Sequence, residues 1–69
     1  MNWEQIQGNW HQLKGRARAK WADITGDDWD RISGRREEMV GLIQERYGKA
    51  KEEAEREVDS WVDAQKENV

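Results

Sequence analysis

The chain has 69 residues and a net charge of −3, and it contains no cysteine and no proline. A chain of this length is expected to form one domain, residues 1–69, near the lower size limit for folding alone. Without cysteine it has no disulfide and no thiolate metal ligand, which fits a reducing compartment. No apolar run approaches the ~20 residues that cross a bilayer, and no secretory signal is visible, so we expect a cytoplasmic protein without membrane insertion.

The first expected element is helical. Its apolar residues recur every three or four positions, which places them on one stripe of a helix. Asn2 is expected to cap this segment, with Gln5 completing a capping box. Gly8 leaves two alternatives open, one long helix or a short helix followed by a longer one. The stripe consists of Trp3, Ile6, Trp10, Leu13, Ala17 and Trp21.

The clearest break is a Thr-Gly-Asp-Asp sequence that begins at Thr25. Gly26 suits a turn there, and either Thr25 or Asp27 suits the N-cap of the next helix. A short helix carrying Trp29 and Ile32 is expected to follow.

Two longer helices are expected after a break at Ser33-Gly34. The first covers residues 35–47, and Gly48 is suited to the left-handed conformation that ends a helix. The second covers residues 50–65, after which the last few residues are expected to fray. The inward-facing residues are Met39, Val40, Ile43 and Tyr47 in the first helix, and Ala54, Val58, Trp61 and Val62 in the second.

A sequence motif recurs 26 residues later in the chain, which predicts two similar helical segments around one core. Glycine inside a helix costs roughly 0.5–1 kcal/mol relative to alanine. Glycines at the same register therefore suggest close helix packing or a bend, with backbone contact to a ligand as the alternative. On the packing interpretation, Gly41→Val should destabilise more than Lys51→Ala. The matching positions are Trp3 and Trp29, Ile6 and Ile32, Gly8 and Gly34, Leu13 and Met39, Gly15 and Gly41, and Trp21 and Tyr47.

No pattern in the sequence indicates catalysis, a cofactor or a metal. His11 has no nucleophile or acid partner in an obvious motif, so we expect a solvated surface side chain. An acidic cluster lacks the ligand spacing of a calcium loop and is interpreted as helix capping. The tryptophans follow the apolar stripes, so core packing is favoured over base stacking. The acidic cluster is Asp27, Asp28 and Asp30, and the tryptophans are Trp3, Trp10, Trp21, Trp29 and Trp61.

The strongest signal for a partner is a basic segment with no acidic residue. On a helix its side chains flank both sides of the apolar stripe, so a solvated role is favoured over a polyanion-binding surface. The candidate polyanion contacts are Lys14, Arg16, Arg18 and Lys20.

Two stretches resemble the signatures of the CsbD-like family, which comprises small bacterial proteins associated with general stress responses and includes the YjbJ-like proteins of enteric bacteria. Residues 8–15 read GNWHQLKG, and residues 41–48 read GLIQERYG, followed by KEEAE at residues 51–55. The resemblance implies a compact all-helical domain of four or five short helices, similar to SAM-like bundles. It carries no catalytic residues over to this chain.

We therefore expect an all-α bundle built from two similar helical segments, with no enzymatic activity. The expected function is a soluble stress-response protein that acts as an interaction module, as a monomer or weak dimer. Another protein is favoured as its partner over nucleic acid. Two alternatives remain open: weak, non-specific binding of nucleic acid through the Lys14–Lys20 segment, and protection by the abundance of a highly charged protein.

Overall fold

The chain folds into five helices in a computed structural model that describes residues 2–66, and these residues contain no strand. The all-α prediction is confirmed. The expected fraying of the last few residues lies outside the described residues. The helices are α1 (Trp3–Gly8), α2 (Trp10–Lys20), α3 (Gly26–Arg31), α4 (Arg36–Tyr47) and α5 (Lys51–Lys66).

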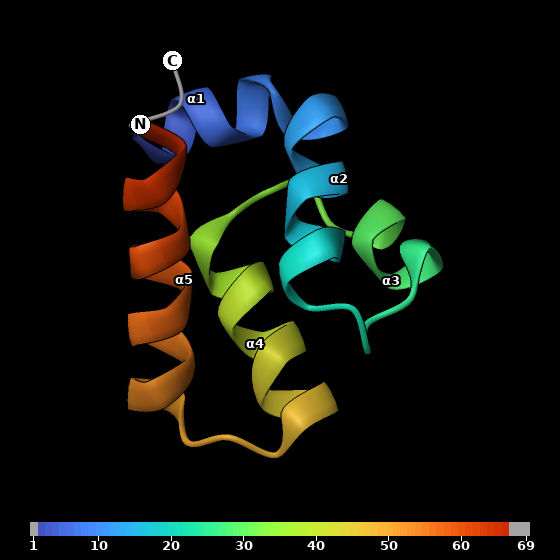
Figure 1. The fold of residues 1–69 in the computed structure, drawn as a ribbon, viewed down its shortest axis with the longest axis vertical. Coiled ribbons are helices and arrows are strands. Elements are labelled where there is room, and N and C mark those ends of the chain that lie inside the picture. Colours follow the sequence, from blue (N-terminus) through green and yellow to red (C-terminus); the bar gives the residue numbers. More distant parts are fainter. Residues whose placement is uncertain (1, 67–69) are drawn as a thin grey trace.

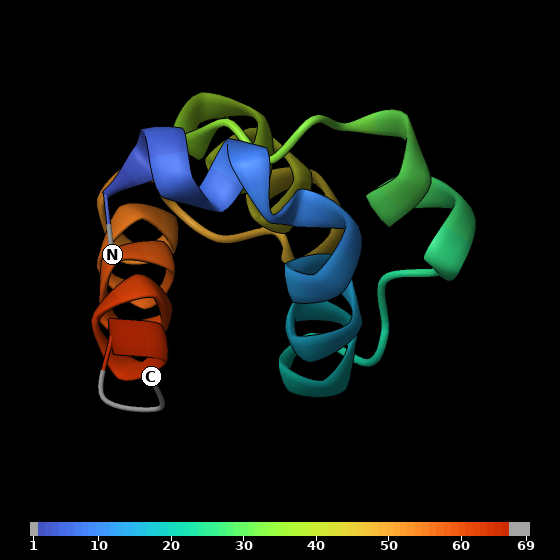
Figure 2. The ribbon, with the colours of Figure 1, turned by 90° about the horizontal axis from the view of Figure 1, so that it is seen from above.

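The arrangement places α4 and α5 as an antiparallel pair, with α2 alongside them (Figure 1). Helix α1 crosses between the last turns of α5 and the start of α2, and α3 lies on the side of α2 away from α5 in both views (Figures 1 and 2). The α4–α5 pair makes the most extensive contact in the molecule. Helix α3 packs mainly against α2.

The core is centred on four indole rings that contact one another in a chain. The ring centroids of Trp10 and Trp29 are 6.0 Å apart, those of Trp29 and Trp21 are 5.9 Å apart, and those of Trp21 and Trp61 are 5.8 Å apart. All four rings are buried, which confirms core packing for them, whereas Trp3 is half-buried at the edge. The other buried apolar residues are Ile6, Leu13, Ala17, Ile24, Met39, Val40, Ile43, Ala54, Val58 and Val62.

The first helical segment is divided at Asn9, so the alternative of a short helix followed by a longer one is correct. The predicted capping box is present: the Asn2 side chain accepts from the Gln5 backbone N–H at 2.8 Å, and the Gln5 side chain accepts from Asn2 N–H at 3.1 Å. The two repeat copies are related only in part. Leu13 and Met39 are both buried, whereas Trp3 is more exposed than Trp29.

Of the two predicted N-caps of α3, Thr25 is correct, whereas the helix ends before Ile32, earlier than predicted. Thr25 is its N-cap, with Oγ1 accepting from the Asp28 N–H at 3.4 Å, so Gly26 is the first helical residue rather than part of a turn. The turn itself occupies residues 21–24. Ile32 lies beyond the helix in an extended conformation, where it packs at the edge of the core.

The start of α4 is stabilised by a carboxylate that the sequence analysis did not identify. Glu38 Oε1 accepts from the N–H and the hydroxyl of Ser33, at 3.0 and 2.9 Å, and from the Arg35 N–H at 3.3 Å. Burial raises the pKa of Glu38, but these hydrogen bonds outweigh it and hold the pKa below its ordinary value. The other end of α4 follows the prediction, since Gly48 is left-handed with φ 64°.

The packing interpretation of the repeated glycines is correct for only one of four. Gly34 has φ 88°, and a Cβ there would lie 2.9 Å from the Trp10 ring. At Gly8, Gly15 and Gly41 a Cβ would meet nothing within 4 Å. A Cβ at any of these three positions has open space around it, so the expected overpacking in Gly41→Val has no structural basis.

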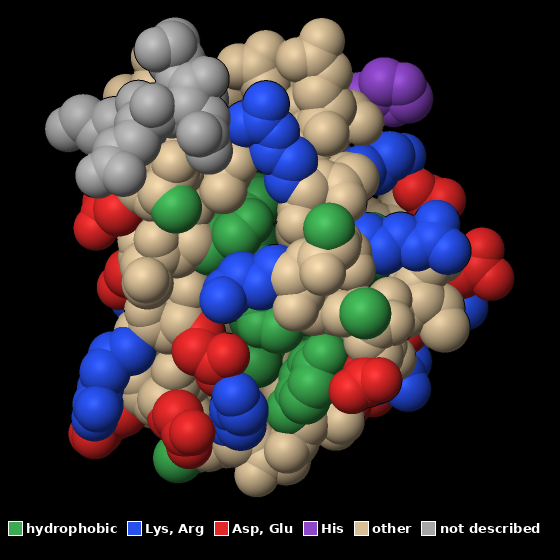
Figure 3. Space-filling view, in the orientation of Figure 1, with side chains coloured by type: hydrophobic (Ala, Val, Ile, Leu, Met, Phe, Trp, Pro, Cys, Tyr) green, Lys and Arg blue, Asp and Glu red, His purple; other side chains and the backbone are tan. Residues whose placement is uncertain are grey.

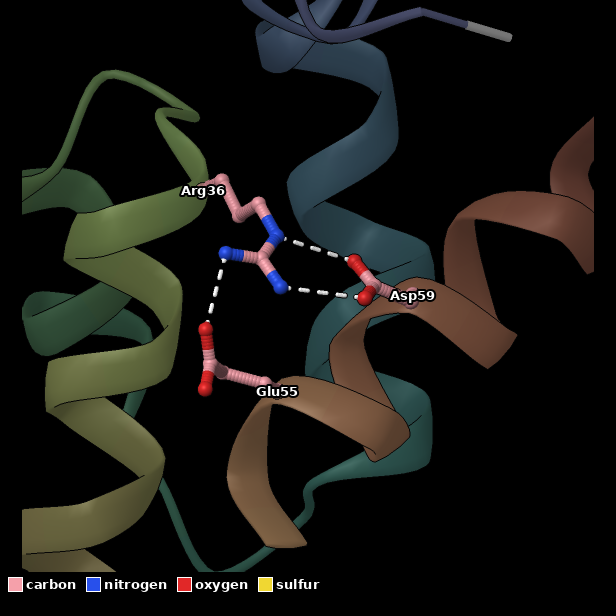
Figure 4. Close-up of polar contacts among 3 residues, drawn as sticks. All are labelled: Arg36, Glu55 and Asp59. Carbon is pink, nitrogen blue, oxygen red and sulfur yellow. Dashed lines mark hydrogen bonds and ion pairs between the residues drawn. The ribbon is translucent and has the colours of Figure 1, made fainter. Parts of the chain in front are cut away.

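Arg36 joins α4 to α5 through two carboxylates (Figure 4). Its Nε and Nη2 donate to the two oxygens of Asp59, both at 3.0 Å, and its Nη1 donates to Glu55 at 3.1 Å. The hydrogen bonds from Arg36 hold the pKa of Asp59 below its ordinary value; burial opposes the shift and the charge of Arg36 adds to it. Asp59 is half-exposed, so the pair stabilises the fold only modestly.

Replacing glycine by alanine should have opposite effects at positions 34 and 41. Gly34→Ala forces a Cβ into a left-handed residue against an indole, and we expect a loss of about 1–3 kcal/mol in the free energy of unfolding. Gly41→Ala adds a methyl group in open space inside a helix, and we expect a gain of roughly 0.5–1 kcal/mol. Urea denaturation of both variants measures the difference, and equal midpoints would contradict the described environments.

Acidification should weaken the contact between Arg36 and Asp59. Because the pKa of Asp59 is depressed in the folded state, its contribution is present above the unfolded value of about 3.9 and is lost as pH falls through the lower folded value. Arg36→Gln should therefore reduce the loss of stability below about pH 4. Arg56→Gln, an exposed change of the same charge on α5, is the control. Identical acid dependences for the two variants in thermal melts would contradict this role.

Candidate functional site

The four basic residues of the predicted polyanion segment lie on two sides of α2. Lys14 Nζ donates to Asp30 at 2.6 Å, on the side facing α3. On the other side, Arg16 donates to the buried Gln65 of α5 at 3.0 Å, and the Lys20 ammonium lies 5.5 Å from the centre of the Trp21 ring. Basic and acidic side chains also alternate over the face seen in Figure 3. The structure therefore does not gather the four cations on one surface.

A surface hollow of about 170 Å³ lies between α2 and α3. On α2 its wall is formed by positions 11, 14, 15 and 18, which share one face of a helix because they are three, four and seven residues apart. Two of the four predicted basic residues thus meet at one place, together with a tryptophan and an aspartate from α3. The lining residues are His11, Lys14, Gly15, Arg18, Gly26, Trp29 and Asp30.

The charges around the hollow are not balanced. The hydrogen bond and the charge of Lys14 hold the pKa of Asp30 below its ordinary value, so Asp30 stays ionised; burial opposes this shift, and Arg18 adds to it. Arg18 itself makes no hydrogen bond or ion pair with any residue from 2 to 66. Its guanidinium lies over Gly26, where a Cβ would come within 3.1 Å of Nη1. The site therefore holds two cations and one carboxylate.

Trp29, which contributes to the wall of the hollow, has an indole N–H without an acceptor in residues 2–66. The side chain is 1% exposed, and its Nε1–H has no acceptor among the residues that the structure describes. The backbone oxygen of Trp29 accepts from Trp10 Nε1 at 3.4 Å, which fixes α3 against α2. A buried donor without an acceptor is uncommon in native proteins.

His11 is exposed, as predicted, but it lies at the rim of this hollow, which the sequence analysis did not identify. The hollow could not be found from the sequence because its two walls come together through contacts between α2 and α3, such as Trp10–Trp29 and Lys14–Asp30, that no local pattern reveals. The basic segment and the repeated Gly15 indicated only the α2 half of it.

A second hollow, of about 250 Å³, lies between α4 and α5 and has Gly41 in its wall. Gly41 is the repeat counterpart of Gly15, so the same register position opens onto a surface hollow in both copies. The other lining residues are Arg36, Glu37, Val40, Gln44, Lys51 and Glu55.

The acidic cluster of α3 has a different role at each position. Asp27 is exposed in the first turn, as capping predicts. Asp28 is buried and pairs with Arg46 of α4 at 2.8 Å, a contact that the sequence analysis did not identify. Asp30 pairs with Lys14 rather than capping the helix, because it lies beyond the first turn on the face toward α2. Over residues 2–66, no group of three or more metal-binding side chains comes together.

The relatives of this chain are bacterial proteins of similar length. The CsbD-like family matches residues 4–56. A UPF0337 protein of Pectobacterium atrosepticum is 52% identical over 66 residues, or 96% of each chain. The UPF0337 protein YjbJ of Escherichia coli O6:H1 is 51% identical over 61 residues, or 88% of each chain. A UPF0337 protein of Bordetella pertussis is 49% identical over 63 residues, covering 91% of this chain and 96% of the relative.

In the part of the chain that the structure describes, no helix has the length and apolar character needed to span a membrane.

The two arginines near Asp28 should contribute unequally to stability. Arg46 lies 2.8 Å from the buried carboxylate, whereas Arg31 lies 4.0 Å from it and is 78% exposed. Arg46→Gln leaves the carboxylate without its close partner, and we expect a loss on the order of 1–3 kcal/mol in the free energy of unfolding. Arg31→Gln should cost less than about 0.5 kcal/mol. Chemical denaturation compares them, and a larger loss for Arg31→Gln would contradict the pairing.

Proposed function

Because this chain belongs to the CsbD-like family, whose general association is with bacterial stress responses, we propose that it acts in such a response as a non-enzymatic interaction module in the cytoplasm. The observation that carries the proposal is the pair of helix glycines, Gly15 and Gly41, that open onto surface hollows. A binding partner that contacts the helix backbone at these two positions would explain why both residues are glycine.

Neither glycine serves the fold of the isolated chain. Each lies inside a helix, where glycine costs roughly 0.5–1 kcal/mol relative to alanine. Neither has a positive φ, and neither has a neighbour that a Cβ would meet within 4 Å. The packing that explains Gly34 is therefore missing at Gly15 and Gly41. The remaining alternatives from the sequence analysis are a bend of the helix and a close backbone contact with another molecule. The hollow beside each glycine favours the contact.

The surroundings of the single histidine support a binding role over a catalytic one. A general base needs a partner that orients it and a reacting proton within reach. His11 is exposed and makes no hydrogen bond with the residues at positions 2–66. The carboxylate nearest to it in the hollow, Asp30, is engaged by Lys14.

The polyanion alternative is less well supported by the geometry. Lys14 and Arg18 face α3, whereas Arg16 faces α5 and is held by Gln65. A nucleic acid lying along one side of α2 would meet two of the four cations, with Asp30 among them. Contacts between cationic side chains and phosphates dominate the affinity of protein–nucleic acid complexes. Two such cations beside a carboxylate therefore predict weak, salt-sensitive binding.

Filling the hollows should separate binding from stability. Glutamine is a good helix former and reaches into the space beside the helix, so Gly15→Gln and Gly41→Gln should each stabilise the fold by about 0.5 kcal/mol. On the proposed function, at least one of them should lose a partner that the unaltered chain captures from stressed bacterial cells. Quantitative mass spectrometry of captured molecules provides the measurement.

Gly8→Gln is the matched control, since Gly8 is also open to solvent but lines neither of the two hollows. This variant should capture the same molecules as the unaltered chain. If both hollow-filling variants also captured the same molecules in the same amounts, the interaction role assigned to these surfaces would be wrong.

A further inference from the structure

We propose that the hollow between α2 and α3 binds a hydrogen-phosphate group, with Lys14 and Arg18 as its cationic contacts and Asp30 accepting the hydrogen bond from its protonated oxygen. The inference rests on the proposed interaction role and specifies the chemistry recognised at one of its two surfaces. The ligand is the free inorganic ion, since a phosphate monoester has lost most of its last phosphate proton at neutral pH.

The hollow holds two cationic side chains close together. Lys14 and Arg18 are one helical turn apart on α2 and both line the hollow. Arg18 has no hydrogen-bonding or ionic partner among residues 2–66, and Lys14 has only Asp30. Arginine presents several donors in a planar fork that suits phosphate oxygens, and lysine adds a compact positive charge. An anion between them would therefore receive charge-assisted hydrogen bonds from the Arg18 guanidinium and from the N–H groups of Lys14 that Asp30 does not engage.

The hollow is large enough for a phosphate ion. Its volume is about 170 Å³, whereas a water molecule takes up about 30 Å³ in the liquid, so a tetrahedral oxyanion fits with water beside it. Gly15 contributes no side chain to the wall, and no atom lies within 4 Å of where its Cβ would be. The backbone of α2 is thereby left open to the occupant. Gly26 similarly leaves the room that the Arg18 guanidinium occupies.

Asp30 selects the kind of anion. An ionised carboxylate can only accept hydrogen bonds, so it repels an anion that has no proton to donate. Hydrogen phosphate keeps one O–H at neutral pH, which can donate to Asp30, whereas sulfate has none. Hydrogen phosphate carries two negative charges, so it can also compete with the Asp30 carboxylate for Lys14. The pair of cations with one carboxylate therefore favours phosphate over sulfate, although the two ions have similar size and shape.

Nuclear magnetic resonance titration of the full chain tests this assignment. The probes are inorganic phosphate, glycerol 3-phosphate and sulfate, added at constant ionic strength while the backbone amides of Gly15 and Gly26 are observed. We expect saturable shifts at both glycines with inorganic phosphate. Binding of sulfate and of glycerol 3-phosphate, whose phosphate is mainly the unprotonated dianion at neutral pH, should be weaker by about tenfold or more, because each loses a hydrogen bond to a charged group. Binding of the ester as tight as that of inorganic phosphate would show that the hydrogen bond to Asp30 does not select the ligand, and it would overturn the assignment.

Two double variants with the same change in charge provide the matched comparison. Lys14→Gln with Arg18→Gln should weaken phosphate binding by about tenfold or more. Arg16→Gln with Lys20→Gln, on the other side of α2, should leave it within about twofold, because long-range attraction between exposed charges is largely screened. Asp30→Asn, which supplies a donor, should bring the affinities for phosphate and sulfate within about twofold of each other. Amide spectra of each variant establish that the fold is retained.

Several results would overturn the assignment. These are the absence of saturable shifts with inorganic phosphate, equal affinity for sulfate in the unaltered chain, and equal weakening by the two double variants. The last result would indicate general attraction to the basic segment. If phosphate fails to bind while Gly15→Gln still loses a captured partner, the assignment of phosphate is wrong and the interaction module stands. If neither occurs and Gly41→Gln also has no effect, both proposals are wrong.

Discussion

The fold depends on the chain of indole contacts that runs from Trp10 through Trp29 and Trp21 to Trp61. The Trp10–Trp29 and Trp21–Trp61 links join segments that are far apart in the sequence, so the chain fixes α3 and α5 against α2. A buried aromatic ring removes about 150–250 Å² from water, which is a large share of what a small core can offer. The buried indole N–H groups of Trp21 and Trp29 have no acceptor among the described residues, so apolar packing outweighs hydrogen bonding here.

Helix α3 shows how this constraint leads to the candidate site. A helix of six residues is not stable alone in water, so α3 exists because Trp29 is buried and Asp28 pairs with Arg46. The burial of Trp29 against Trp10 sets α3 beside α2, the ion pair joins α3 to α4, and the hollow lies between α2 and α3. Lys14 and Arg18 then line this hollow, with Asp30 as the one acid among the described residues of its wall. The same core that stabilises the domain therefore determines which charges meet at its surface.

Local periodicity was enough to predict most of the helices and their buried faces, because an apolar stripe specifies which side of a helix turns inward. The end of α3 was misplaced because Ile32 matches the stripe yet leaves the helix to reach the edge of the core. The glycines show the limit more clearly: Gly34 and Gly41 share a repeated pattern, but only Gly34 meets an indole. Its neighbour comes from α2, and no local pattern reveals that contact. The ion pair between Arg36 and Asp59 is likewise set by the pairing of α4 with α5.

The basic segment could be identified from the sequence. Its division into two sides of a helix was also predictable, but the residues that each side contacts were not. Helical spacing separates Lys14 and Arg18 from Arg16, as the sequence analysis recognised. The presence of Asp30 and Trp29 opposite the first pair depends on where α3 packs. A site formed by two short helices is therefore hidden from sequence periodicity even when each half of it is recognisable.

The most direct test of this account is a measurement of nuclear Overhauser contacts among the indole ring protons in solution. The account predicts cross-peaks from Trp29 to both Trp10 and Trp21, since their centroids lie 6.0 and 5.9 Å from that of Trp29. Ring protons of Trp29 should also be shifted by the neighbouring rings. A Trp29 indole with the shifts of free tryptophan and no contact to either ring would show that α3 does not pack on α2 in this way, and it would remove the basis for the hollow.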